Sequence, residues 1–191
     1  MQRLGLFGGA FNPVHLGHLL VAEAAVEELG LDRLFFIPTA LSPFKQNDET
    51  APAQARLRWL RLALSGRPCY EIDEQEIQRG GVSYTIETAR HYARQFPNAR
   101  RFYLIGADNV PKLNEWRDAN ELANLVEFAA VPRPARAPPV FPKPFRGVVL
   151  RGFAMDISSL QIRARVKAGL SIQYLTPPFV AQAIGDTGAY R

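Results

Sequence analysis

The sequence predicts an α/β fold in which helices cover both faces of a doubly wound parallel sheet. Short apolar runs alternate along the chain with segments whose apolar residues recur at helical spacing. Strands that alternate with helices in this way are joined by right-handed crossovers and pair in parallel. The 191 residues suffice for one well-buried domain and are short for two, so residues 1–191 are predicted to form a single domain.

The first half of the chain is predicted to contain three strands and two helices. An apolar run predicts a buried strand at residues 4–7, and helical spacing predicts a helix over residues 17–29. The β-favouring run at residues 33–37 predicts the second strand, which a proline ends. Leucines at helical spacing predict a helix over residues 53–64, and an acidic strand near a sheet edge is expected over residues 70–77.

The second half continues the alternation. Ser83 or Thr85 is predicted to cap a helix that ends before Pro97. Residues 132–144 hold six prolines, which predicts an extended loop. The remaining predicted strands are residues 102–105, 127–131 and 147–150. The remaining predicted helices are residues 118–125, 159–168 and 177–184.

The loops that follow the predicted strands are the expected location of a ligand site. These loops are residues 8–18, 39–45, 106–108 and 132–136. In a parallel sheet such loops meet at the carboxyl edge, where ligands bind at the point of strand-order reversal. The sequence therefore predicts a single large site.

Composition narrows the class of protein. No apolar run approaches the ~20 residues that span a bilayer, and no signal-peptide pattern is seen, so no membrane partner is expected. Cys69 is the only cysteine, which excludes an intrachain disulfide and favours a reducing, cytoplasmic location. The net charge of +5 suits a pocket for several phosphates as well as a nucleic-acid binder. Arg56, Arg58 and Arg61 are interpreted as the solvated face of a helix rather than a nucleic-acid stripe.

Residues 6–18 carry the strongest chemical signal. Gly8 and Gly9 allow a sharp turn after the first strand, and His15 and His18 lie where the following helix starts. A helix start attracts anions, and histidines three apart can face one phosphate and stabilise charge on its oxygens. An isolated histidine pair of this spacing is also compatible with surface residues or a partial metal site. The turn has neither the Walker G-K-[ST] nor the dinucleotide-binding G-x-G-x-x-G spacing.

The string G-x-F-x-P-x-H-x-G-H at residues 9–18 resembles the signature of the nucleotidyltransferase superfamily that includes nicotinate-nucleotide, phosphopantetheine and glycerol-phosphate nucleotidyltransferases. The resemblance implies a Rossmann-like fold that binds ATP, with His15, His18 and Arg163 as the catalytic residues. The ATP-binding residues that it implies are Gly8, Gly9, Ala10, Phe11, His15, His18, Gly106, Asp108, Ser158, Ser159 and Arg163.

A second motif lies at residues 158–163, Ser-Ser-Leu-Gln-Ile-Arg. Ser159 and Arg163 are four apart, so a hydroxyl and a guanidinium can share one face beside a helix start, while one of the two serines caps the helix. The motif resembles the I-S-S-T-x-I-R sequence that the same superfamily uses for the β- and γ-phosphates of ATP. Leu160 replaces the usual threonine, which removes one hydroxyl.

Other segments resemble the nicotinate-nucleotide adenylyltransferases within this superfamily. The segments are residues 83–85, 106–108 and 113–116, with Pro43 and Lys45. The resemblance implies that Trp116 stacks on the pyridine ring and that Thr85 and nearby amides hold its carboxylate. The acceptor-binding residues that it implies are Thr39, Lys45, Tyr84, Thr85, Trp116 and Arg133.

Each of these residues also has a simpler interpretation. Trp116 is otherwise a core aromatic, and Asp108, predicted to orient ribose or adenine, is otherwise a helix cap. Lys45 and Arg133 are predicted to clamp the acceptor phosphate but are otherwise ordinary solvated charges. The loop at residues 39–45 departs from the family at two positions: Phe44 replaces a histidine, and Thr39 replaces an asparagine. Binding of the acceptor phosphate is therefore assigned to Lys45 and Arg133.

The resemblance implies an enzyme of NAD biosynthesis that transfers AMP from ATP to nicotinate mononucleotide, releasing deamido-NAD and pyrophosphate. Mg²⁺ is expected to enter with ATP, because no carboxylate cage for a metal is evident. The two substrates are the expected partners, nucleic acid is not, and a homodimer is one option for the assembly. The alternatives are a sister enzyme that uses nicotinamide mononucleotide or phosphopantetheine, and a non-catalytic nucleotide- or RNA-binding module.

Overall fold

The computed structural model describes residues 1–41, 50–132, 137–153 and 155–191. Within these ranges, parallel strands form a six-stranded sheet in the order β3-β2-β1-β4-β5-β6. The strands are β1 (Arg3–Gly9), β2 (Arg33–Pro38), β3 (Tyr70–Ile72), β4 (Arg100–Gly106), β5 (Glu127–Val131) and β6 (Gly147–Val149). The order reverses between β1 and β4, so the predicted doubly wound parallel sheet is confirmed.

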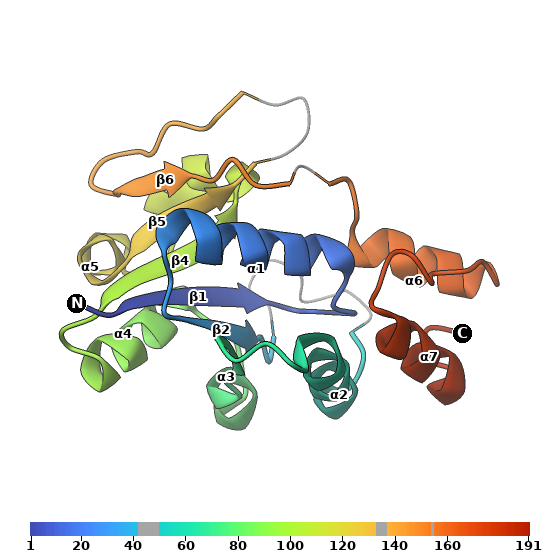
Figure 1. The fold of residues 1–191 in the computed structure, drawn as a ribbon. Helices are drawn as coiled ribbons and strands as arrows, with labels where there is room; N and C mark the ends of the chain where they lie inside the picture. The colour runs from blue at the N-terminus through green and yellow to red at the C-terminus, as the bar shows by residue number, and fades with distance from the viewer. Residues whose placement is uncertain (42–49, 133–136, 154) are drawn as a thin grey trace.

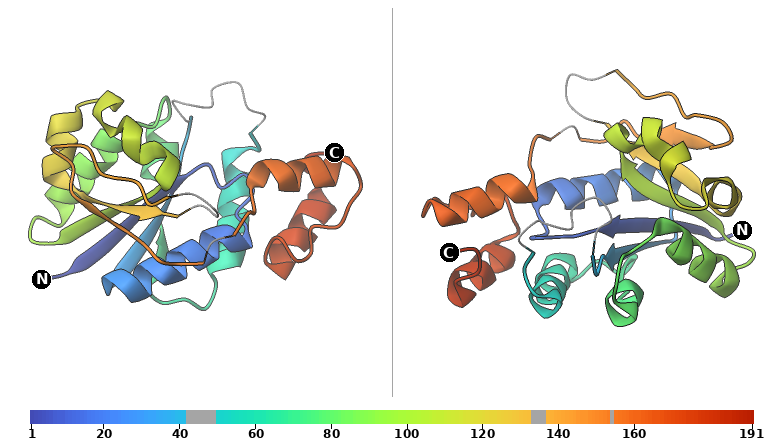
Figure 2. Two further views of the ribbon diagram at one scale, coloured as in Figure 1. Left: turned by 90° about the horizontal axis from the view of Figure 1, so that it is seen from above. Right: turned by 180° about the vertical axis from the view of Figure 1, so that it is seen from behind.

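Helices pack on both faces of this sheet, as predicted (Figure 1). The helices are α1 (Leu16–Leu29), α2 (Ala53–Leu64), α3 (Gln75–Arg79), α4 (Thr85–Gln95), the 3₁₀ helix η1 (Ala107–Glu115), α5 (Ala119–Leu125), α6 (Ser159–Lys167) and α7 (Pro178–Thr187). Apolar side chains of α1, α2, α6 and α7 share one core with Phe36 and Leu104 of the sheet. Those of α4, η1 and α5 share a second core with Leu6 and Tyr103. Figure 2 shows α1 and the α4–α5 pair on opposite sides of the sheet.

The C-terminal helices lie at one end of the sheet (Figure 1). α6 and α7 lie together beyond the carboxyl end of β1, next to the start of α1 (Figure 1). Their apolar residues join the first core, so this pair of helices is anchored to the sheet by packing. In the part of the chain that the structure describes, no helix is long and apolar enough to cross a bilayer.

The predicted strand at residues 70–77 is too long. β3 ends at Ile72 and α3 begins at Gln75. Asp73 explains the break, because its carboxylate accepts hydrogen bonds from the Gln75 backbone N–H at 2.9 Å and from the Tyr92 hydroxyl at 2.6 Å. The expected edge position is confirmed, because β3 is the first strand of the sheet order.

The predicted capping of α4 by Ser83 or Thr85 is wrong. Tyr84 is the N-cap residue and makes no side-chain capping bond. The Ser83 hydroxyl oxygen instead accepts the Ala40 backbone N–H at 3.0 Å. Ser83 therefore connects the start of α4 to the loop after β2, a tertiary contact that local propensity does not reveal.

Candidate active site

A cavity of about 570 Å³ lies at the carboxyl ends of β1, β2 and β4, where the strand order reverses. Its volume falls within the ~300–1,000 Å³ typical of small-molecule sites. Nine predicted site residues line it: Ala10, Phe11, His15, His18, Thr39, Gly106, Ser158, Ser159 and Arg163. The structure therefore brings most of the predicted ATP-binding residues to one place, at the location expected for this sheet topology.

We call residues 10–18 the histidine loop. Gly8, just before this loop, and Gly17, within it, allow the backbone to approach neighbouring side chains closely. A Cβ at Gly8, near the end of β1, would overlap the Tyr103 hydroxyl. A Cβ at Gly17 would lie 3.0 Å from His15 Nδ1 and 3.7 Å from Ile157 Cβ. A side chain at Gly17 would therefore crowd the His15 ring, which would have to shift from its position at the start of α1.

The two histidines form a pair at the start of α1. His15 is the N-cap residue, and its ring stacks on that of His18 with centroids 3.7 Å apart and 29° between the planes. The His15 backbone N–H donates to His18 Nδ1 at 3.2 Å. Because Nδ1 accepts this bond, a neutral His18 carries its proton on Nε2. Nε2 is therefore the atom through which His18 would donate to a phosphate at this helix N-terminus.

The second motif docks directly onto the histidine loop. The Ser159 hydroxyl donates to the Pro13 carbonyl at 2.9 Å, and Arg163 Nη1 donates to the Asn12 carbonyl at 3.0 Å. Ser158 is the N-cap of α6, as predicted for one serine of the pair. Residues separated by about 150 positions in the sequence thus form one wall that carries two histidines and an arginine, all donors suited to phosphate oxygens.

Arg56 is not on a solvated face, and that prediction is wrong. Its side chain is 2% exposed, whereas the other two arginines of the group are exposed. The guanidinium donates to the carbonyls of Ala51 (3.1 Å), Ala10 (2.8 Å) and Thr39 (2.9 Å). Burial lowers the pKa of this guanidinium from its usual range. Arg56 therefore joins the loops that follow β1 and β2 beneath the cavity.

The predicted acceptor residue Thr85 lies close to the glycine turn. Its side chain is hydrogen-bonded to Tyr103, whose hydroxyl lies against Gly8. Burial raises the pKa of the Tyr103 phenol above its usual range, so the phenol stays neutral. Tyr103 thus connects Thr85 to the glycine turn at Gly8. Thr85 does not itself line the described part of the cavity.

Trp116 and Tyr84 also lie outside the described lining of the cavity. Trp116 is partly buried and packs edge-to-face on Phe128, with ring centroids 6.0 Å apart. The Arg117 guanidinium lies over the Tyr84 ring, 4.6 Å from its centroid. Both predicted acceptor aromatics thus pack against the second core, on the α4–α5 face of the sheet.

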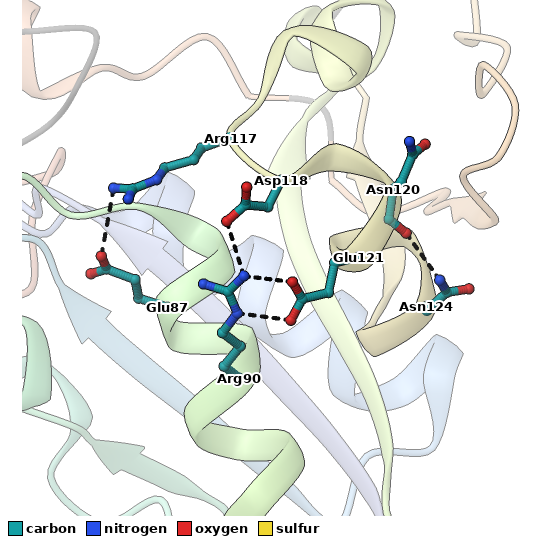
Figure 3. Close-up of polar contacts among 7 residues, drawn as sticks. All are labelled: Glu87, Arg90, Arg117, Asp118, Asn120, Glu121 and Asn124. Atoms are coloured by element: carbon teal, nitrogen blue, oxygen red, sulfur yellow. Dashed lines mark hydrogen bonds and ion pairs between the residues drawn. The ribbon is translucent and has the colours of Figure 1, made fainter.

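Ion pairs hold this face in place (Figure 3). Arg90 of α4 pairs with Glu121 at 2.5 Å and with Asp118 at 2.9 Å. Arg117 pairs with Glu87 at 3.8 Å. The pairs connect α4 to the segment that follows η1, so they fix the backbone on both sides of the predicted acceptor residues. Such solvent-exposed pairs contribute little to stability.

The remaining predicted residues are not among the described residues that line the cavity. Gly9 ends β1, and Asp108 lies exposed in the first turn of η1, outside the described cavity lining. Lys45 and Arg133, together with Phe44, lie outside the described residues. Among the residues that the structure describes, no group of three or more His, Cys, Asp or Glu could hold a metal ion.

Glu76 is a buried carboxyl group that the sequence did not single out. It is 2% exposed and accepts the Thr88 hydroxyl at 2.5 Å. Burial raises the pKa of this carboxyl, and hydrogen bonds from Thr88 and Ser83 partly offset that effect. A raised pKa means that the folded protein holds this proton more tightly than the unfolded chain, so ionisation of Glu76 opposes folding above a pH of about 4.3.

We therefore expect Glu76→Gln to increase the free energy of unfolding at pH 7. The gain should shrink as the pH falls towards about 4, where wild-type Glu76 is protonated in both states. Urea unfolding of both proteins at several pH values measures the difference. A gain of the same size at pH 4 and pH 7, or a loss at pH 7, would contradict this assignment.

Three residues of the site were missed by sequence reasoning: Asn12, Arg56 and Tyr190. Asn12 lies inside the signature string but at one of its variable positions. Arg56 precedes Leu60 by one helical turn, so its position on the apolar face was a usable signal. Tyr190 donates to Asn12 Oδ1 at 2.6 Å, and no local pattern identifies such a contact.

The sequence profile of the cytidylyltransferase-like family matches residues 6–165. Among curated relatives, the Bacillus subtilis (strain 168) protein named "Nicotinate-nucleotide adenylyltransferase" is 35% identical, with 100% of each chain covered. The Opitutus terrae protein named "Probable nicotinate-nucleotide adenylyltransferase" is 39% identical, covering 100% of this chain and 98% of the relative.

Solved structures agree in fold. A Plasmodium falciparum nicotinic acid mononucleotide adenylyltransferase complexed with NaAD has a TM-score of 0.79 at 14% identity, covering 100% of this chain and 98% of that one. A Vibrio parahaemolyticus structure named "Putative Nicotinate-nucleotide Adenylyltransferase" has a TM-score of 0.74 at 20% identity, covering 100% of this chain and 96% of that one. At such identities the likeness shows the Rossmann-like fold alone. The family profile and the full-length curated relatives place this chain in the cytidylyltransferase-like family, among the nicotinate-nucleotide adenylyltransferases.

Proposed function

We propose that this protein transfers the AMP moiety of ATP to nicotinate mononucleotide, yielding deamido-NAD and pyrophosphate. The observation that carries the proposal is the docking of α6 on the histidine loop. It gathers His15, His18 and Arg163 around one cavity at the sheet's switch point. Full-length similarity to proteins named for this reaction supports the choice of substrates.

The reaction needs alignment and charge stabilisation rather than a protein nucleophile. A phosphate oxygen of the mononucleotide attacks the α-phosphorus of ATP in line, and the bond from that phosphorus to the bridging oxygen of pyrophosphate breaks. His18 Nε2–H donates to the α-phosphate, and His15 stabilises the leaving oxygens. Arg163 grips the pyrophosphate end, since its bond to Asn12 uses only one of five N–H donors.

Mg²⁺ enters with ATP as part of the substrate. The cavity presents imidazole, guanidinium and hydroxyl groups, which suit phosphate oxygens. Magnesium prefers oxygen ligands in octahedral geometry and retains water, so in this proposal the triphosphate and water supply its coordination. Its contribution is to offset phosphate charge during transfer.

The acceptor extends from the cavity towards α4 and η1, beyond the described lining. Thr85 and its neighbouring amides bind the nicotinate carboxylate, and the Trp116 indole stacks on the pyridinium. Thr39 contacts the acceptor from the cavity wall and Tyr84 from the start of α4. Asp108 contacts the nucleoside of ATP, and Lys45 and Arg133 bind the acceptor phosphate. The protein works in the cytoplasm, where its lone thiol stays reduced.

Pyrophosphate release from Mg-ATP tests the proposal directly. The assay compares nicotinate mononucleotide, nicotinamide mononucleotide and phosphopantetheine as acceptors at equal concentration. We expect release with nicotinate mononucleotide to be the fastest. Faster release with another acceptor would identify a sister enzyme, whereas no release and steeply salt-dependent RNA binding would identify a binding module.

Trp116→Ala should weaken the acceptor and leave ATP nearly unaffected, because the indole belongs to one substrate's site. A cation–π contact of about 1–2 kcal/mol predicts a rise in the acceptor KM of about 5- to 30-fold. Phe141→Leu, a change in an aromatic residue packed against the same core, is the matched control. Equal rises in the KM values of both substrates would contradict the stacking role.

A further inference from the structure

The C-terminal part of the chain is hydrogen-bonded to the histidine loop at several points. Besides the bonds from Ser159 and Arg163, the Leu16 backbone N–H donates to the Leu175 carbonyl at 3.0 Å. The Tyr190 hydroxyl adds a bond of 2.6 Å to the side chain of Asn12. Of these contacts, only the last runs from a side chain outside the described cavity lining to a side chain that lines the cavity.

Tyr190 packs in the first core and is not among the residues that line the described cavity. Its side chain is 8% exposed, and its ring lies 5.6 Å from that of Trp59, between centroids. The hydroxyl therefore reaches Asn12 from a buried residue that is not part of the described cavity lining. Packing fixes the donor of this bond, the Tyr190 hydroxyl, so the bond orients the Asn12 side chain without contacting substrate.

Asn12 connects this interior contact to the phosphate-binding wall. It is 4% exposed, and its Oδ1 accepts both the Tyr190 hydroxyl at 2.6 Å and the Ala51 N–H at 3.0 Å. Two donors on one amide oxygen fix the orientation of the side chain. The Asn12 carbonyl receives Arg163 Nη1, so the same residue sets the position of the guanidinium.

We propose that Tyr190 is a positioning residue for ATP: its hydroxyl fixes Asn12, and Asn12 in turn aligns Arg163 with the two histidines. The inference rests on the proposed function, since it assumes that the triphosphate binds along this wall. Tyr190→Phe removes one hydroxyl and keeps the ring packing against Trp59. Loss of a buried hydrogen bond of ordinary strength predicts about fivefold weaker binding of Mg-ATP.

The test measures the Kd of Mg-ATP by calorimetry for wild type, Tyr190→Phe, Asn12→Ala and the double variant. Tyr174→Phe is the control, because that side chain is 84% exposed. We expect Tyr190→Phe to weaken Mg-ATP about fivefold, Tyr174→Phe to bind like wild type, and the double variant to bind no more weakly than Asn12→Ala alone. A purely structural role would lower the melting temperature without producing this non-additivity.

Two results would overturn the inference: equal Kd values for Tyr190→Phe and Tyr174→Phe, or losses from Tyr190→Phe and Asn12→Ala that multiply in the double variant. Pyrophosphate release by the wild-type protein is measured in parallel. If the wild type binds Mg-ATP but releases no pyrophosphate with any acceptor, the proposed reaction fails, while the Kd values still decide the role of Tyr190.

Discussion

Replacement of His18 by alanine is expected to lower kcat about a hundredfold. The variant loses the Nε2–H donor, which is oriented by the bond from the His15 backbone N–H to Nδ1. A preorganised donor to developing phosphate charge typically contributes about 10²–10³ to turnover, whereas the affinity for ground-state ATP changes less. Turnover at saturating substrates and ATP affinity are therefore measured on the same preparations.

His91→Ala is the matched control for this prediction. His91 lies on α4, where its ring contacts Tyr92 and not the cavity. It should keep wild-type turnover. A folded His18→Ala variant that retains more than about half of the wild-type kcat would exclude the catalytic role, because even 1.4 kcal/mol corresponds to a tenfold change. A lower melting temperature with unchanged turnover would instead indicate that His18 acts only in packing.

Replacement of Arg56 by methionine is expected to cost about 3 kcal/mol of stability or more. Methionine fills part of the buried volume but leaves the carbonyls of Ala10, Thr39 and Ala51 without this donor. An acceptor that loses its buried donor typically costs about 1–3 kcal/mol. The variant no longer has to bury the Arg56 charge, and this gain offsets part of the loss of stability. Urea unfolding, extrapolated linearly to water, measures the loss.

Arg58→Met on the same helix provides the comparison, since that side chain is exposed. Its effect should stay within about 0.5 kcal/mol of wild type. If both variants lose the same stability, the effect belongs to the helix and not to the buried guanidinium. If Arg56→Met matches wild type, the three carbonyl bonds contribute nothing measurable.

Much of the fold could be predicted because its signals are local. The β-favouring run at residues 33–37 corresponds closely to β2, and helical spacing over residues 159–168 corresponds closely to α6. Capping of α6 by Ser158 was also predictable, since a cap bonds within one turn. The cavity's location followed from the alternation of strands and helices, because topology fixes where the strand-following loops meet.

Two of the errors have a common physical cause. Arg56 was assigned to solvent because arginine is rarely buried, yet three backbone carbonyls from distant loops satisfy it. The strand over residues 70–77 was overextended because Asp73 is stabilised by Tyr92, nineteen positions away. In both cases a tertiary contact overrides the local preference of the chain. The 3₁₀ helix η1 was missed for another reason: its buried residues Ala107, Val110 and Leu113 recur every third position, but Pro111 inside it argues against a helix.

The contacts that shape the phosphate-binding wall join residues separated by 146, 151 and 178 positions. Closing loops of such length is entropically costly. A ligand that binds only the native state adds RT ln(1 + [L]/Kd) to its stability. ATP is thus expected to stabilise the folded protein, because it binds the wall whose long-range contacts carry the highest entropic cost of loop closure.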